Sequence, residues 1–247
     1  MNVRRRAVLL AACSLFLVAP LQAADPPPGR DVLVLGGTGQ LGAEIVRRLV
    51  AAGDRVTVFT RPGSDRSRLA GLPVTWVEGD LTKAADVAAA FRGRRYQYLI
   101  SAVRVQNADP HFYASFLPAV TAEAKAAGVA QFLHHGAVGA GRNAEKFPGI
   151  GWEKVPGLLD RLKDQGEGED LIRGSGVPYT IIRNTRLYPA GTPATGKAVL
   201  TEDDTVINAM TRADLADLTL KCLGNPACVG KTYHVKDGSL PWPPPRP

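Results

Sequence analysis

The chain has 247 residues, a formal net charge of +7 and three cysteines. Part of the positive charge lies in one N-terminal arginine cluster. The other basic residues are scattered among acids without interleaved aromatic residues, so we expect no nucleic-acid partner. About 220 residues follow the N-terminal segment, enough for one domain with a real core, and no internal repeat is visible.

Residues 1–24 have the organisation of a secretory signal peptide. Arg4-Arg5-Arg6 is followed by an apolar core at residues 7–18 and by small residues suited to cleavage. The apolar run is short for a membrane-spanning helix, so we expect no stable anchor after cleavage, with an uncleaved anchor as the alternative. Arg5-Arg6-Ala7-Val8-Leu9 also resembles the twin-arginine pattern. This pattern predicts export to the periplasm by a route that can move folded proteins.

A glycine-rich turn then lies between an expected strand and an expected helix. Residues 31–35 form an apolar run typical of a buried strand, and residues 43–52 have helical apolar spacing that ends at Gly53. In this context, glycines allow a dinucleotide pyrophosphate to approach the backbone and the helix N-terminus. The alternative is a tight turn without a ligand. The residues expected to bind the dinucleotide are Gly36, Thr38, Gly39, Gln40, Leu41 and Gly42.

Strands and helices alternate through the following residues. We expect strands at residues 55–59, 74–77, 98–103, 131–135 and 179–183, and helices at 82–91 and 112–127. This order predicts right-handed crossovers and an α/β fold with a Rossmann-type, doubly wound parallel sheet, whose ligand lies at the carboxyl ends of the strands.

The C-terminal part differs in composition from the rest. Residues 25–240 are expected to form the dinucleotide-binding domain. Within it, residues 184–240 are rich in Gly, Pro and Thr, contain one helix near 213–223, and are expected to form a small lobe on the substrate side. Residues 241–247 form a proline-rich tail that we expect to be extended or disordered.

The residue after the second strand predicts which cofactor is bound. An acid there usually bonds the ribose diol of NAD, but this chain has Thr60-Arg61. A guanidinium group can hold a 2′-phosphate, so we expect NADP(H) rather than NAD(H), with NAD still possible and a solvated Arg61 as the alternative. Asp80-Leu81 is expected to face the adenine, and Ala102-Val103 the nicotinamide ribose.

These features together resemble the atypical short-chain dehydrogenase/reductases of the NmrA-like kind. The matching segments are Gly36–Gly42, Thr60-Arg61-Pro62, Glu78–Leu81, Ser175–Arg183 and Thr211–Asp217, in the family's order. The resemblance implies a Rossmann fold with a small C-terminal substrate lobe and a bound NAD(P).

The catalytic residues that the resemblance implies are not found. Enzymatic members use a Ser or Thr after the fifth strand and a Tyr-x-x-x-Lys pair on the next helix. Here the serine place is Gly136-Ala137, the tyrosine place is Arg161 and the lysine place is Gln165. Gly166 and Gly168 could disturb the helix, and a shift would then bring Lys163 into the site.

Other residues are candidates for supplying a proton. His134 and His135 are expected at the carboxyl end of the fifth strand, on opposite faces, so that one of them, such as His135, could point towards the nicotinamide. A buried core histidine is the alternative. Tyr188, beyond the sixth strand, is a further candidate.

The last two cysteines have two interpretations. Cys222 and Cys228 flank an Asn-Pro turn and could close a small disulfide loop in an exported chain, or they could be two unpaired apolar residues. No histidine stands nearby, so no metal site is expected.

Two functions are compatible with these patterns. The first is an NADP(H)-dependent oxidoreductase acting on a small carbonyl-type compound, with hydride chemistry supplied by the cofactor. The second is a non-catalytic NADP(H)-binding sensor or partner-binding protein.

Overall fold

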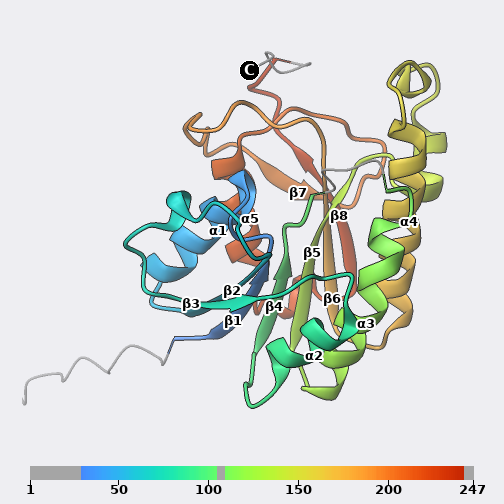
Figure 1. Cartoon of the computed structure of the whole chain (residues 1–247). Helices are drawn as coiled ribbons and strands as arrows, with labels where there is room; N and C mark the ends of the chain where they lie inside the picture. Colours follow the sequence, from blue (N-terminus) through green and yellow to red (C-terminus); the bar gives the residue numbers. More distant parts are fainter. Residues whose placement is uncertain (1–28, 105–108, 242–247) are drawn as a thin grey trace, which may run out of the picture.

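The computed structural model of the chain describes residues 29–104 and 109–241. Its strands form one sheet in the order β3-β2-β1-β4-β5-β6-β8-β7, in which β7 alone is antiparallel to its neighbour (Figure 1). The strands are β1 (Asp31–Leu35), β2 (Arg55–Thr60), β3 (Val74–Glu78), β4 (Tyr98–Ser101), β5 (Gln131–Ala137), β6 (Tyr179–Asn184), β7 (Val199–Thr201) and β8 (Lys231–Lys236).

Five α-helices within these residues cover the two faces of the sheet. They are α1 (Gln40–Ala51), α2 (Ala84–Phe91), α3 (Phe112–Ala126), α4 (Leu158–Gly174) and α5 (Arg212–Cys222). Helices α1 and α5 pack together on one face, whereas α3 packs between α2 and α4 on the other (Figure 1). Four short 3₁₀ helices complete this part of the chain, at Ser67–Leu69, Gly141–Lys146, Trp152–Lys154 and Pro226–Cys228.

Strand β1 divides its side chains between the two layers. Val32 and Val34 belong to the core beneath α1 and α5, whereas Leu33 and Leu35 belong to the core beneath α2 and α3. All four are at most 2% exposed, as expected for a central parallel strand covered on both faces. Burial of each such side chain contributes about 1.5–3 kcal/mol.

The predicted Rossmann-type sheet is confirmed, and its strands differ from the prediction in some of their ends and in their number. Strand β5 extends to Ala137, two residues beyond the expected end, and β4 ends at Ser101, two residues earlier than expected. Strands β7 and β8 were not predicted, because β7 has three residues and both depend on pairing with distant parts of the chain.

The segment 184–240 lies partly over the carboxyl ends of the strands and partly within the layers. The chain between β6 and α5 passes across this edge of the sheet (orange in Figure 1), held by a bridge between Leu187 and Met210. Helix α5 then packs on α1, and β8 pairs with β6. The last two elements therefore extend the sheet and its helical layer.

The disturbance that Gly166 and Gly168 could have caused in the helix does not occur. Helix α4 continues through both glycines. A Cβ atom on Gly166 would lie 2.3 Å from the Cα of Gly141, and one on Gly168 would lie 2.7 Å from Leu117 Cδ1. The two glycines therefore allow α4 to pack closely against its neighbours.

Candidate functional site

The turn after β1 has a geometry that requires glycine. Gly36 has a φ of +76°, and its carbonyl accepts a hydrogen bond from the Gly39 amide at 3.0 Å. A Cβ atom on Gly36 would lie 2.8 Å from the carbonyl oxygen of Ala102. The turn therefore packs directly against the end of β4, as the turn of a dinucleotide site does.

Helix α1 presents its N-terminus at this turn. Gly39 is the N-cap, and no described side chain caps the helix or places an acid in its first turn. A Cβ atom on Gly42 would lie 2.2 Å from the Gly36 carbonyl oxygen, whereas one on Gly39 meets only that oxygen, at 3.2 Å. Gly39 and Gln40 are exposed, Thr38 is half-buried, and Leu41 packs against the core. The open N-terminus can hold an anionic group.

The carboxyl end of β2 has several arginines with different surroundings. Thr60 is buried, and Arg61, which follows it, is exposed. Arg66 pairs with Glu78 and lies over the Trp76 ring at 4.5 Å. Arg61 is close enough to Asp80 for its charge to contribute to lowering the pKa of that carboxyl.

The ends of β3 and β4 complete this side of the site. Asp80 accepts hydrogen bonds from the amide and hydroxyl of Thr82, at 3.0 and 2.8 Å, and these bonds are the main reason that its pKa is lowered. Leu81 packs against the core beneath α2. Ala102 donates to the carbonyl of Leu35 at 3.0 Å, and the carbonyl of Val103 accepts from the Tyr113 hydroxyl at 3.0 Å. The structure thus brings the residues predicted to bind the dinucleotide to one edge of the sheet.

The two histidines of β5 lie below this edge. Both are at most 5% exposed, and burial lowers the pKa of each to about 3. The His134 ring packs against Tyr113 and Phe132. Because the Thr219 hydroxyl donates to the Leu215 carbonyl, its oxygen accepts from His135 Nε2, at 3.1 Å. Both histidines are therefore neutral core residues, and their predicted place at the end of the strand was wrong.

The remaining candidates for proton transfer have surroundings of their own. Lys163 is exposed on α4, and because that helix is regular no shift carries it into the site. Tyr188 is buried, and its hydroxyl donates to the Pro241 carbonyl at 3.1 Å. Arg161 and Gln165 stand at the tyrosine and lysine places, and both are half-buried.

A buried carboxylate occupies the space beside the serine place. A Cβ atom on Gly136 would lie 2.4 Å from Oε1 of Glu169, which is fully buried. Arg183 donates to Glu169 from Nε at 3.1 Å and from Nη2 at 2.7 Å, and Arg173 donates at 2.8 Å. Glu169 was not among the predicted site residues, although it lies four residues after Gln165 on the same helix.

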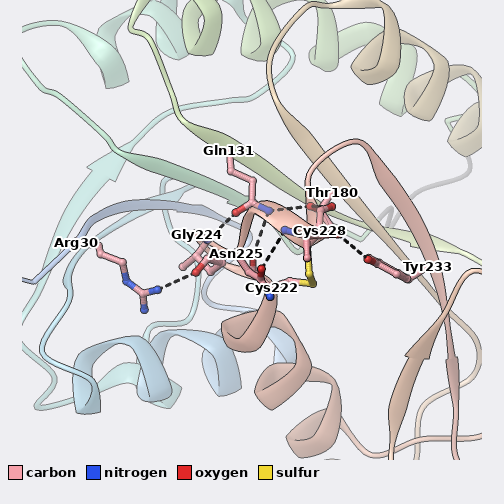
Figure 2. The surroundings of a disulfide bond; sticks show 10 residues. Arg30, Gln131, Thr180, Cys222, Gly224, Asn225, Cys228 and Tyr233 are labelled. Atoms are coloured by element: carbon pink, nitrogen blue, oxygen red, sulfur yellow. Dashed lines mark hydrogen bonds between the residues drawn. A yellow bond between two sulfur atoms is a disulfide. The ribbon is translucent and has the colours of Figure 1, made fainter.

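The two cysteines form a disulfide at the amino ends of the strands, opposite the candidate site. Cys222 ends α5, Cys228 precedes β8, and their Cα atoms are 5.5 Å apart (Figure 2). Gln131 donates to the Cys222 carbonyl at 3.2 Å, and Thr180 donates to the Cys228 carbonyl at 2.6 Å. The disulfide interpretation is therefore confirmed.

Within residues 29–104 and 109–241, no group of side chains could hold a metal ion.

Comparison with known proteins gives the family and the fold. Residues 36–226 match the profile of the NAD(P)H-binding family. Sterol demethylase protein B of Methylococcus capsulatus is 33% identical over 130 residues, which are 50% of this chain and 40% of that protein. A (4-alkanoyl-5-oxo-2,5-dihydrofuran-3-yl)methyl phosphate reductase of Streptomyces griseus is 26% identical over 83% of this chain and 67% of its own length.

Two solved structures have the same fold. ChuY, an anaerobillin reductase of Escherichia coli, has a TM-score of 0.73 and 23% identity over 85% of this chain and 98% of its own. A short-chain dehydrogenase/reductase of Veillonella parvula, solved with NADP, has a TM-score of 0.68 and 14% identity over 87% of this chain and 97% of its own.

Proposed function

This chain belongs to the NAD(P)H-binding family, and we propose that it is an NADPH-dependent reductase of small carbonyl or enone-like compounds. The observation that carries the proposal is the open turn at Gly36–Gly42, with α1 behind it and Arg61 at the end of β2. The Streptomyces reductase to which the chain is similar supports a reduction of this kind.

Arg61 supports the preference for NADPH. It stands where an NAD-selective site has an acid, and its side chain is exposed at the edge that holds the glycine turn. A guanidinium group can form charge-assisted hydrogen bonds with a 2′-phosphate that NADH lacks. The Veillonella structure that shares the fold holds NADP.

The surroundings of the candidate acids favour a reaction with little acid catalysis from the protein. His134 and His135 are buried and neutral, Lys163 is exposed, and Glu169 fills the space beside the serine place. NADPH supplies hydride when bound, and the protein's part is to orient the cofactor against the substrate, with a solvent proton completing the reduction. The name of the Streptomyces relative describes a reductase whose substrate carries oxo and alkanoyl groups.

We further propose that the protein acts outside the cytoplasm. The segment that resembles a twin-arginine signal, residues 1–24, lies outside the described residues. The Cys222–Cys228 disulfide supports this proposal, because disulfides persist in oxidising compartments. No helix in the described ranges has the length and apolar character to cross a membrane.

The test is the absorbance of the purified protein with NADPH and a panel of aldehydes, ketones and enones. Substrate-dependent loss of the nicotinamide signal supports a reductase. Nucleotide that binds tightly and is not oxidised by any compound of the panel supports a non-catalytic sensor, which the missing Ser/Tyr/Lys set also allows. No binding of either nucleotide contradicts both functions.

A further inference from the structure

Two arginines at the carboxyl edge of the sheet have no acidic partner among the described residues. Arg104 is the third residue after β4 and is exposed, and Arg212 is the first residue of α5 and is half-buried. Neither belongs to an ion pair formed within residues 29–104 and 109–241. Residues 105–108, which follow Arg104, contain no acid.

The fold brings these two arginines to the same edge of the sheet as the glycine turn, because α5 leads into β8, which runs parallel to β6. Ala102, which lies between β4 and Arg104, is in close contact with Gly36. A Cβ atom on Gly36 would lie 2.8 Å from the Ala102 carbonyl oxygen. Helix α5, which begins at Arg212, packs on α1. Burial and the charge of Arg104 both lower the pKa of Arg212. The two guanidinium groups therefore lie near each other, with an unfavourable like-charge interaction.

The acids of α5 are already bound to other groups. Asp214 accepts hydrogen bonds from the amides of Thr195 and Gly196, at 2.8 and 2.9 Å. Asp217 pairs with Arg48 on α1. Neither carboxylate is thus available to neutralise Arg212.

Within the part of the chain that the structure describes, Arg212 is held by one neutral contact. Its Nη1 donates to the carbonyl of Tyr188, in the chain that crosses the edge of the sheet. That carbonyl is itself positioned by the Tyr188 amide, which donates to Met210 at 2.9 Å. One arm of the guanidinium is therefore fixed, and its remaining N–H groups can bind a ligand at the edge where the cofactor and substrate are expected.

We propose that Arg104 and Arg212 together bind a carboxylate or phosphate group of the substrate. This inference rests on the proposed function and narrows its substrate class to anionic carbonyl compounds. A guanidinium binds carboxylate or phosphate oxygens with charge-assisted hydrogen bonds, and an anion between the two arginines would relieve their mutual repulsion. The same chemistry could instead serve the cofactor's own phosphates, and the experiment separates the two sources.

The test uses the full mature protein saturated with NADP⁺ and two probes of equal size, benzoate and benzamide. Their binding is measured by ligand-observed NMR or calorimetry for wild type, Arg104→Gln, Arg212→Gln and the double variant. Arg186→Gln, an exposed arginine beyond β6, is the matched control. The Kd of NADPH is measured for each variant by fluorescence.

We expect the wild-type protein to bind benzoate at least about tenfold more tightly than benzamide. Each single variant should lose about tenfold in benzoate affinity, and the double variant should bind benzoate and benzamide equally. The Kd of NADPH should change less than about twofold, the scatter that unrelated surface substitutions give. Arg104→Gln is decisive if Arg212→Gln fails to fold, because Arg104 is exposed.

Two results would overturn the inference. One is equal binding of benzoate and benzamide by wild type. The other is a loss of NADPH affinity in the variants as large as the loss of benzoate affinity, which would assign the arginines to the cofactor. If wild type binds no nucleotide, the proposed function fails, and the benzoate preference, measured without nucleotide, then tests the arginine pair alone.

Discussion

Arg183 and Glu169 form an ion pair inside the protein, beside the position where the family's serine or threonine stands. The Glu169 carboxylate is fully buried and receives Nη2 of Arg183 at 2.7 Å, and Gly136 leaves no space between the strand and this carboxylate. A charge removed from water in this way is stable only with its partner in place.

Gly136→Ser is therefore expected to destabilise the protein and to create no catalytic hydroxyl. Its Cβ would lie 2.4 Å from Glu169 Oε1, so the carboxylate must shift, which disturbs its hydrogen bonds with Arg183. We expect a loss of about 3–5 kcal/mol in the free energy of unfolding, as when a buried ion pair is broken, measured by urea denaturation. Ala137→Ser is the control. Unchanged stability of Gly136→Ser would show that the pair can rearrange freely.

Arg61→Ala is expected to weaken NADPH binding by roughly 1.5–3 kcal/mol, or one to two orders of magnitude, through the loss of a charge-assisted contact with the 2′-phosphate. The affinity for NADH should hardly change. Arg55→Ala is the control, since this exposed arginine pairs with Asp31 at the opposite end of β2. Fluorescence titration with both nucleotides checks the prediction, and equal losses for both would show that Arg61 does not bind the phosphate.

Gly39→Val is expected to abolish binding of both nucleotides while the protein stays folded. The φ of Gly39 is −70°, which valine can adopt, and its Cβ would meet only the Gly36 carbonyl oxygen, at 3.2 Å. The branched side chain would then occupy the space expected for the pyrophosphate. The measurement is nucleotide titration together with circular dichroism, and Gly174→Ala is a control far from the turn. Retained affinity in a folded variant would refute the assignment of the turn.

Protonation of the buried histidines should contribute to acid unfolding. The pKa of His134 and of His135 is about 3 in the folded protein, below the ordinary value of 6.5. Between these values the unfolded chain binds more protons, so stability falls as the pH falls from 6.5 towards 3. Each histidine contributes up to about 1.4 kcal/mol per pH unit. Urea denaturation at several pH values, with His135→Gln for comparison, measures this slope. An identical slope in the variant would contradict the prediction.

The segment proposed to direct export, residues 1–24, lies outside the described ranges. NADP(H) is made in the cytosol, and an unfolded chain cannot carry a non-covalent nucleotide through a membrane, so a route for folded proteins would allow loading before export. Replacing Arg5 and Arg6 by Lys should then hold the protein in the cytoplasm, as measured by fractionation and by the size of the mature chain. Normal export and cleavage of the double-lysine variant would indicate the route for unfolded chains.

The sequence by itself determined the features that depend on neighbouring residues. The apolar run at residues 31–35, the glycine turn and α1 are adjacent in the chain, so local spacing predicted them, together with the parallel sheet. The place of Arg61 at the end of β2 followed in the same way, because strand order locates every carboxyl end at one edge.

Tertiary structure alone decided what depends on contacts between distant residues. Strands β7 and β8 exist through pairing with each other and with β6, and the histidines of β5 are neutral because helices cover both faces of the sheet. The approach of Glu169 to Gly136 and of Arg104 to Arg212 likewise depends on packing. Spacing along the chain cannot predict such contacts, because they form only when whole elements are placed in the core.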